Sequence, residues 1–163
     1  MSEATNNILT PAEIAEALEQ SVTPLHEMKG IRMEEMEAVY ALAHDFYQAG
    51  RFEDAETLFR FLTMFDHLNV KYWMGYGAVE QVLKKWDNAI KAYALVCVTL
   101  DVHNVKASYY AAECHLARGD RANAISALDF VKEYAENNEM GREFRAKAEQ
   151  LRARILANDQ KEG

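Results

Sequence analysis

The sequence predicts an all-α protein built from antiparallel helix pairs stacked in a row. Both prolines, Pro11 and Pro24, lie in the first 24 residues, so no proline interrupts a later helix. From residue 33 onward apolar residues recur at spacings of three and four, with few β-branched runs, as in amphipathic helices. Turn signals recur evenly, at "AGRF", "LKKW" and "RGDR". Long helices broken at regular intervals are typical of a helical solenoid.

Composition places few demands on the fold and excludes several function classes. The 163 residues are enough for one domain with its own core. No run approaches the roughly 18–20 apolar residues of a membrane span, so we expect no membrane insertion. The first twenty residues carry four glutamates and no lysine or arginine, which is unlike a signal peptide and predicts a cytoplasmic protein. Cys97 and Cys114 lie inside helical patterns without metal-ligand spacing, so we expect reduced thiols, no metal and no cofactor.

The negative charge is concentrated near the N-terminus. Residues 1–37 hold eight acidic and two basic residues, a net of −6 out of the total of −8. A chain without a basic stripe is a poor binder of phosphate backbones, so nucleic acid is not an expected partner. The basic residues near the C-terminus alternate with glutamates and predict a solvated helix face: Arg142, Arg145, Lys147, Arg152 and Arg154.

The first helix is predicted from its capping signals. "TPAE" supplies Thr10 as N-cap, Pro11 at the first helical position and Glu13 to complete a capping box. "TPLHEMKG" then breaks this helix. The expected helices lie near 11–21, 33–48, 52–65, 70–83, 86–99, 105–117, 121–135 and 141–157. The last carries an apolar stripe that would cap the open end of the stack: Phe144, Ala148, Leu151 and Ile155.

A repeat of 34–35 residues organises the middle of the chain. Ala55, Ala89 and Ala124 are each followed by large apolar residues four and seven positions on. This period and pattern are typical of the tetratricopeptide repeat, a hairpin of two helices in contact at the alanine. The third repeat is the weakest, because it contains one extra residue. The predicted organisation is an acidic helical segment at 1–32, three repeats at 33–137, and a capping helix and tail at 138–163.

The helix at 33–48 carries two apolar stripes. The first stripe is expected to close its hairpin on Ala55 and Phe59 and consists of Val39, Leu42, Ala43 and Phe46. The second stripe, Tyr40, His44 and Tyr47, lies about a hundred degrees further round the helix. Placing Ala55 at repeat position 20 puts this stripe at positions 5, 9 and 12, which face the concave side. The same positions in the next two repeats hold Met74, Ala78, Gln81, Tyr109, Glu113 and Leu116.

Two interpretations of the second stripe are open. Tyr40 and Tyr47 pack against the N-terminal helix, or they line a groove that binds a peptide. Tyrosine combines a large apolar body with a hydrogen-bonding tip, which suits a binding surface. His44 has no nucleophile or carboxylate pair near it in the pattern, so no enzymatic activity is expected.

Several motifs resemble the class II type III secretion chaperones, which serve hydrophobic translocator proteins of Gram-negative bacteria. These are "Y40-x₂-A43-x₃-Y47-x₂-G50-R51-x₃-A55-E56", "D66-H67-x-N69" and "A111-A112-E113-C114-x-L116". The resemblance implies a cytoplasmic, ATP-independent chaperone that keeps two translocators apart before export. It further implies client recognition through Tyr40, Tyr47 and Tyr93, although spacing alone assigns Tyr93 to hairpin packing. It also implies a homodimer formed through the N-terminal helix, here Ile14 and Leu18, and in some members assistance to a transcriptional activator.

A second function class is a general tetratricopeptide adaptor for a partner's peptide or C-terminus, or a regulatory co-factor. Such adaptors clamp a terminal carboxylate and need lysine, arginine and asparagine at the groove positions. The predicted groove positions hold mainly aromatic and aliphatic side chains instead, which favours an apolar client.

Overall fold

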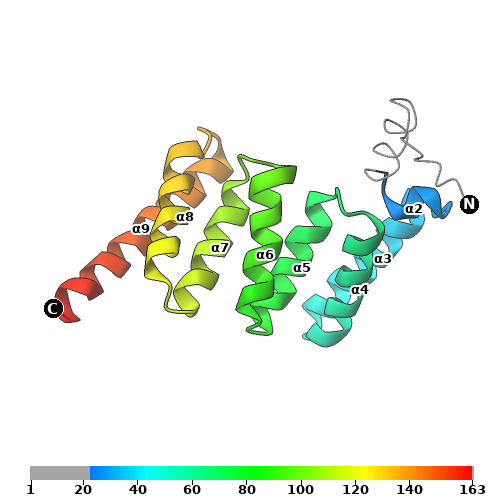
Figure 1. Ribbon diagram of the computed structural model, residues 1–163, viewed down its shortest axis with the longest axis horizontal. Coiled ribbons are helices and arrows are strands. Elements are labelled where there is room, and N and C mark those ends of the chain that lie inside the picture. Colours follow the sequence, from blue (N-terminus) through cyan, green and yellow to red (C-terminus); the bar gives the residue numbers. More distant parts are fainter. Residues whose placement is uncertain (1–22, 163) are drawn as a thin grey trace, which may run out of the picture.

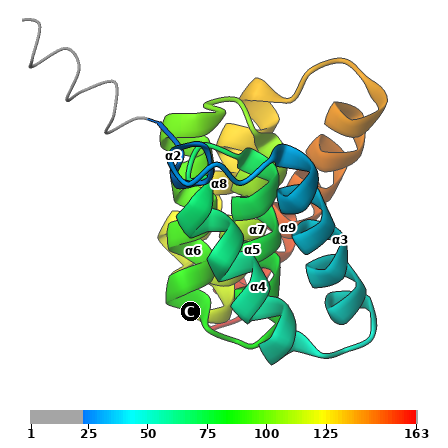
Figure 2. The same ribbon diagram turned by 90° about the vertical axis from the view of Figure 1, so that its right-hand side faces the viewer.

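The computed structural model describes residues 23–162, which fold as a row of antiparallel helices (Figures 1 and 2). The predicted helix at 11–21, and with it Ile14 and Leu18, lies outside the described residues. The elements are α2 (Leu25–Met28), α3 (Met33–Gln48), α4 (Phe52–Phe65), α5 (Val70–Val82), α6 (Trp86–Leu95), η1 (Val96–Leu100), α7 (Val105–Ala117), α8 (Arg121–Tyr134) and α9 (Glu139–Glu162). The hairpins α3–α4, α5–α6 and α7–α8 are the three predicted repeats, so the all-α tetratricopeptide fold is confirmed.

The three hairpin turns share one backbone geometry. Gly50, Lys84 and Gly119 occupy the left-handed region with φ of 75°, 59° and 78°. In each turn this residue's N–H donates to the carbonyl three residues earlier, as from Gly50 to Tyr47 at 3.1 Å. A left-handed residue after the last helical turn favours glycine, and the lysine at the second turn is the exception. The turn signals in the sequence therefore mark the hairpins correctly.

The repeat alanines lie in the buried core of the hairpins. Ala55, Ala89 and Ala124 are completely buried, which lets paired helices approach at a small side chain. The large apolar residues four and seven positions on are also buried: Phe59, Leu62, Tyr93, Val96, Leu128 and Val131. Each buried aliphatic or aromatic side chain contributes about 1.5–3 kcal/mol by leaving water. The alignment of the repeats is confirmed by this burial pattern.

The capping role predicted for the last helix agrees with its packing. Phe144, Ala148 and Ile155 are buried in one cluster with residues of α7 and α8, and Leu151 packs against it. Arg152 pairs with Asp129 of α8 at 2.7 Å. The helix begins at Glu139 and ends at Glu162, longer than the expected 141–157.

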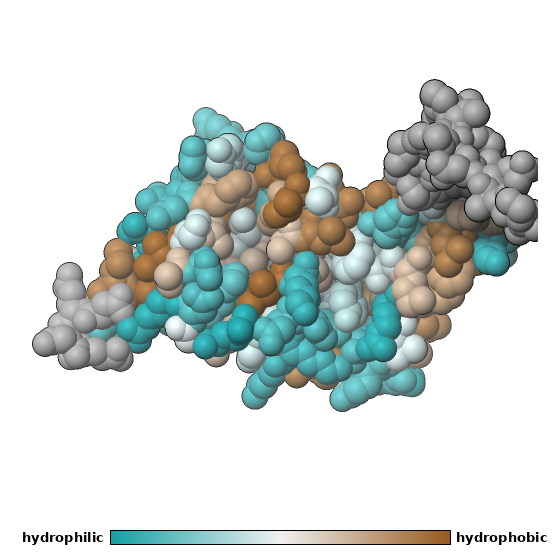
Figure 3. Space-filling model, in the orientation of Figure 1, coloured by the Kyte–Doolittle hydropathy of each residue, from teal (hydrophilic) through white to brown (hydrophobic). Residues whose placement is uncertain are grey.

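Three further details differ from the expectations. A short helix, α2, occupies part of the predicted break. The helix expected at 86–99 ends at Leu95 and continues as the π-helix η1, which leaves Val98 exposed. Apolar surface shows over the upper end of α6 in Figure 3. Leu42, which was expected to close its hairpin, is 46% exposed. Ala111 holds the same position in the third repeat and is buried, because it packs against α6 of the preceding hairpin.

Candidate functional site

A groove with a volume of about 740 Å³ runs along the first helices of the three hairpins. Its lining is mostly apolar and aromatic and includes residues of α3, α5, α6 and α7. Seven of the ten residues predicted for partner binding line it: Tyr40, His44, Tyr47, Met74, Ala78, Gln81 and Tyr93. The remaining lining residues are Gln48, Phe59, Lys71, Gly75, Val82, Trp86, Asn104, Lys106 and Tyr110.

The α3 wall of the groove is built from rings that also pack within the fold. Tyr40 meets Phe59 edge-on with ring centroids 5.9 Å apart and lies 5.8 Å from Tyr72. Tyr47 meets Phe52 edge-on at 5.5 Å. Both tyrosines are half-buried, whereas His44 is exposed. The second stripe of α3 therefore belongs partly to the hydrophobic cluster and partly to the groove surface, and its rings are held in place before any partner arrives.

The α5 side of the groove depends on two glycines. A Cβ atom on Gly75 would overlap the ring of Phe59, and one on Gly77 would lie 2.6 Å from Cε1 of Tyr93. Their absent side chains let both rings lie directly against the α5 backbone. Met74 and Ala78 line the groove on the same helix. The spacing of the second stripe therefore predicts the face of α5 that lines the groove.

A chain of hydrogen bonds joins α6, α5 and α7 at the groove lining. The Tyr93 hydroxyl donates to Oε1 of Gln81 at 2.9 Å, and Nε2 of Gln81 donates to Oε2 of Glu113 at 3.0 Å. Burial raises the pKa of Tyr93 far above its usual range, with further contributions from Cys114, Tyr110 and other neighbours. Tyr93 is therefore a neutral hydroxyl donor at physiological pH.

The third repeat contributes to the groove differently from the expectation. Tyr109 packs edge-on against Phe144 of α9 at 5.5 Å, and Leu116 packs against the cluster of α8 and α9. The adjacent Tyr110 lines the groove instead and lies 5.8 Å from Tyr93. The period-based expectation omits Tyr110 because it is one residue beyond the counted position. Among the described residues, Glu113 reaches the groove only through its bond to Gln81.

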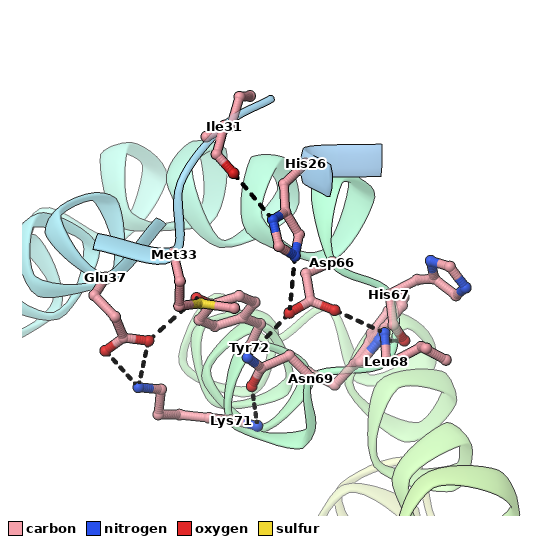
Figure 4. Close-up of polar contacts among 11 residues, drawn as sticks. His26, Ile31, Met33, Glu37, Asp66, His67, Leu68, Asn69, Lys71 and Tyr72 are labelled. Atoms are coloured by element: carbon pink, nitrogen blue, oxygen red, sulfur yellow. Dashed lines mark hydrogen bonds and ion pairs between the residues drawn. The ribbon is translucent and has the colours of Figure 1, made fainter. Parts of the chain in front are cut away.

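The rim of the groove near α2 is polar, as Figure 4 shows. Lys71 bridges to Glu37 at 2.7 Å, and its ammonium lies 4.3 Å from the centre of the Tyr40 ring. The hydroxyl of Tyr72 donates to the same Glu37 at 3.2 Å. The hydrogen bond from Lys71 holds the pKa of Glu37 below its usual range, despite some desolvation. The cationic Lys71 is therefore already paired within the fold.

The motif "D66-H67-x-N69" holds the turn next to this rim. Asp66 accepts hydrogen bonds from the Leu68 N–H at 3.3 Å and the Asn69 side chain at 3.2 Å. Asn69 accepts from the Lys71 N–H at 3.1 Å and so caps α5. Asp66 also lies 3.9 Å from His26 of α2 (Figure 4). The motif thus has a structural role at the start of α5.

A buried pair of carboxyl groups, Glu56 of α4 and Glu80 of α5, lies between the first and second hairpins. Glu80 is completely buried and accepts from Asn88 at 2.9 Å. Burial raises its pKa, and nearby Glu56 adds to the shift although Asn88 opposes it. The pKa of Glu56 is lowered: burial opposes this, but ion pairs with Lys85 and Arg60, both at 2.6 Å, outweigh it. Glu80 is therefore the member of the pair that keeps its proton to the higher pH.

The described residues contain no cluster of three or more His, Cys, Asp or Glu side chains able to hold a metal ion. Within residues 23–162 no helix is long and apolar enough to cross a bilayer. The three helix hairpins and the aromatic groove define the class of protein. The chain is a tetratricopeptide-repeat protein whose groove is of the kind that binds other polypeptides.

Comparisons with known proteins agree with this class and narrow it. A family model described as a tetratricopeptide repeat matches residues 40–101. The chaperone protein SicA of Salmonella typhimurium is 33% identical over 145 residues, covering 87% of this chain and 85% of SicA. The Yersinia enterocolitica type III secretion chaperone SycD, solved in complex with a peptide of the translocator YopD, is 30% identical. It superposes with a TM-score of 0.74 over 79% of this chain and 98% of SycD.

PcrH of Pseudomonas aeruginosa, solved with the chaperone-binding region of PopD, is also 30% identical, with a TM-score of 0.75. That match covers 80% of this chain and 97% of PcrH. The chain belongs to the family of class II type III secretion translocator chaperones, whose members include SicA, SycD and PcrH. The family is one of chaperones and not of enzymes.

Proposed function

We propose that this chaperone binds an extended apolar segment of a hydrophobic type III secretion translocator in the groove between α3, α5 and α7. The observation that carries the proposal is the pre-formed aromatic lining, from Tyr40 and Tyr47 to Tyr93 and Tyr110. Small apolar anchors of a client would each gain about 1.5–3 kcal/mol when fully buried there. Ordering the client offsets much of this gain, so binding is specific yet reversible and needs no ATP.

The same binding accounts for a protective role before secretion. A translocator that inserts into membranes exposes apolar segments that aggregate in water. Covering one such segment in the cytoplasm keeps the client soluble and separate from other translocators until export. The net charge of −8 favours the solubility of the complex. We further propose a homodimer through the N-terminal segment carrying Ile14 and Leu18, and a transcriptional activator as an additional partner.

The composition of the groove weighs against a clamp for a C-terminal carboxylate. Lys71 is paired with Glu37. Asn104 accepts from the Ala107 N–H and donates to Asp101, so its side chain is engaged in capping α7. Lys106 alone is a groove cation without a charged partner among the described residues. A carboxylate clamp uses several such groups, whereas here the rings dominate.

The test is co-expression with a hydrophobic translocator from the same bacterium, followed by purification of the complex. The groove variant is Ala78→Phe, which fills the groove without removing a packed ring. The control is Ala41→Phe, the same change at an exposed position of α3 outside the groove lining. We expect the wild type and Ala41→Phe to solubilise the client, and Ala78→Phe to lose it. Equal recovery with Ala78→Phe contradicts the groove as the binding site.

A further inference from the structure

Gln81 is held in one orientation at the centre of the groove lining. Its Oε1 accepts from the Tyr93 hydroxyl at 2.9 Å and its Nε2 donates to Glu113 at 3.0 Å. A carboxylate only accepts hydrogen bonds, so the amide nitrogen must face Glu113 and the oxygen must face Tyr93. Tyr93 is 1% exposed and cannot rotate freely to another partner. The fold therefore fixes both the position and the polarity of this amide.

Half of the hydrogen-bonding capacity of Gln81 remains for a ligand. A carboxamide has two N–H donors and two acceptor lone pairs, and the two contacts above use one of each. The remaining donor and acceptor belong to a side chain that lines the groove. One donor next to one acceptor is the complement of a backbone N–H and C=O in an extended peptide.

An apolar groove creates a need for such a group. Each backbone N–H or C=O of a bound segment loses water, and leaving such a group buried without a partner weakens binding. Aromatic and aliphatic walls recognise side chains but cannot satisfy the backbone. We infer that Gln81 hydrogen-bonds the backbone of the client segment, with Tyr93 and Glu113 as positioning residues that aim its amide. The inference rests on the proposed function and specifies how the groove recognises an extended chain.

The other two amides in the lining do not have this arrangement. Asn104 uses its oxygen for the Ala107 N–H at 2.8 Å and its nitrogen for Asp101 at 2.9 Å, as the cap of α7. Gln48 is exposed at the end of α3, and within residues 23–162 no hydrogen bond fixes its amide. The matched control is Gln150, which carries the same side chain at an exposed position of α9 outside the groove lining.

The experiment measures the affinity for a synthetic peptide by isothermal titration calorimetry. The peptide is the tightest-binding member of a set of overlapping peptides that covers the sequence of the co-purified translocator. We expect Gln81→Leu to weaken binding about tenfold, which corresponds to about 1.4 kcal/mol. Gln150→Leu should stay within twofold of the wild type. Tyr93→Phe keeps the ring and removes the positioning hydroxyl, so it should weaken binding several-fold. Far-UV circular dichroism checks that each variant is folded. If Gln81→Leu does not fold, Tyr93→Phe is the variant that tests the inference.

Single N-methylation of the peptide separates recognition from stability. In the wild type, methylating the amide that bonds to Gln81 should lower affinity at least tenfold. In Gln81→Leu, the loss of affinity on methylating that same amide should fall below threefold, while the loss at every other amide stays as in the wild type. Gln81→Leu with wild-type affinity, or with an unchanged methylation profile, overturns the inference. If Ala78→Phe still abolishes binding in that case, the proposed function stands without it.

Discussion

The contact between Gly77 and Tyr93 leads to a quantitative prediction for Gly77→Ala. A Cβ on Gly77 would lie 2.6 Å from Cε1 and 2.9 Å from Cζ of Tyr93. Carbon atoms pack at about 3.5–4.0 Å, so the overlap approaches an ångström. The ring cannot move aside easily, because it is buried, contacts Tyr110 and is held by its hydroxyl bond to Gln81.

Two opposing terms decide the sign of this effect. Replacing a glycine inside a helix by alanine favours the helix by about 1 kcal/mol. Overpacking a tight core site costs about 1–3 kcal/mol, and an overlap with a fixed ring belongs to the upper part of that range. We therefore expect Gly77→Ala to lower the free energy of unfolding by about 1–2 kcal/mol, a fall in Tm of roughly 3–6 °C.

The assay is urea unfolding followed by circular dichroism, with Tyr93→Leu as the background that tests the cause. Leucine lacks the Cε1 and Cζ atoms that the new methyl group meets. In that background Gly77→Ala should be neutral or stabilising, which gives a coupling energy of about 1–2 kcal/mol in a double-mutant cycle. A stabilising effect in the wild type, or the same cost in both backgrounds, refutes the reasoning.

Three further predictions concern other parts of the fold. Because burial raises the pKa of Glu80, the folded state keeps a proton that the unfolded chain releases. The stability that this proton adds to the folded state is complete at low pH and is lost as pH rises above the ordinary glutamate range. Glu80→Gln should therefore raise Tm at pH 8 more than at pH 5, and an equal change at both pH values argues against this proton. Burial raises the pKa of the Cys114 thiol to about 12, so this thiol should not react in the folded protein. In the variant Cys97→Ser, an aromatic disulfide reagent should therefore label Cys114 only after unfolding, and rapid labelling of the folded protein contradicts this. Phe144→Ala should cost about 3–5 kcal/mol in urea unfolding, because it empties the contact between α9 and α7; a cost below about 1 kcal/mol argues against a capping role.

The sequence predicts the repeats well because their determinants are local. Ala55, Ala89 and Ala124 lie at a constant period, and turn residues such as Gly50 are required by the backbone at fixed places. The first-helix positions that face the groove follow from the same count, since helix geometry converts spacing into direction. The α3 and α5 residues of the groove were therefore within reach of sequence reasoning.

The remaining details depend on tertiary contacts. Tyr109 and Tyr110 are neighbours in sequence, and both pack edge-on against Phe144 of α9. Tyr110 also lies 5.8 Å from Tyr93 of α6 and lines the groove, a contact between helices that spacing within α7 does not report. The end of α6 becomes a π-helix where Thr99 returns a hydrogen bond to the Leu95 carbonyl, a rare form that apolar periodicity does not report. Spacing alone assigns Tyr93 to hairpin packing. In the structure its ring packs in the hairpin and also lines the groove, which spacing does not predict.

Site-specific photo-cross-linking tests the binding of a translocator in the groove. A benzophenone amino acid replaces Met74, which lines the groove, or Met140, which is 50% exposed on α9 outside the lining. Each variant is co-expressed with the translocator, irradiated and digested for mass spectrometry. We predict a cross-link from position 74 to one short apolar segment of the translocator, and none from position 140. A cross-link of equal yield from position 140, or none from position 74 in a complex that still co-purifies, would contradict the assignment of the groove.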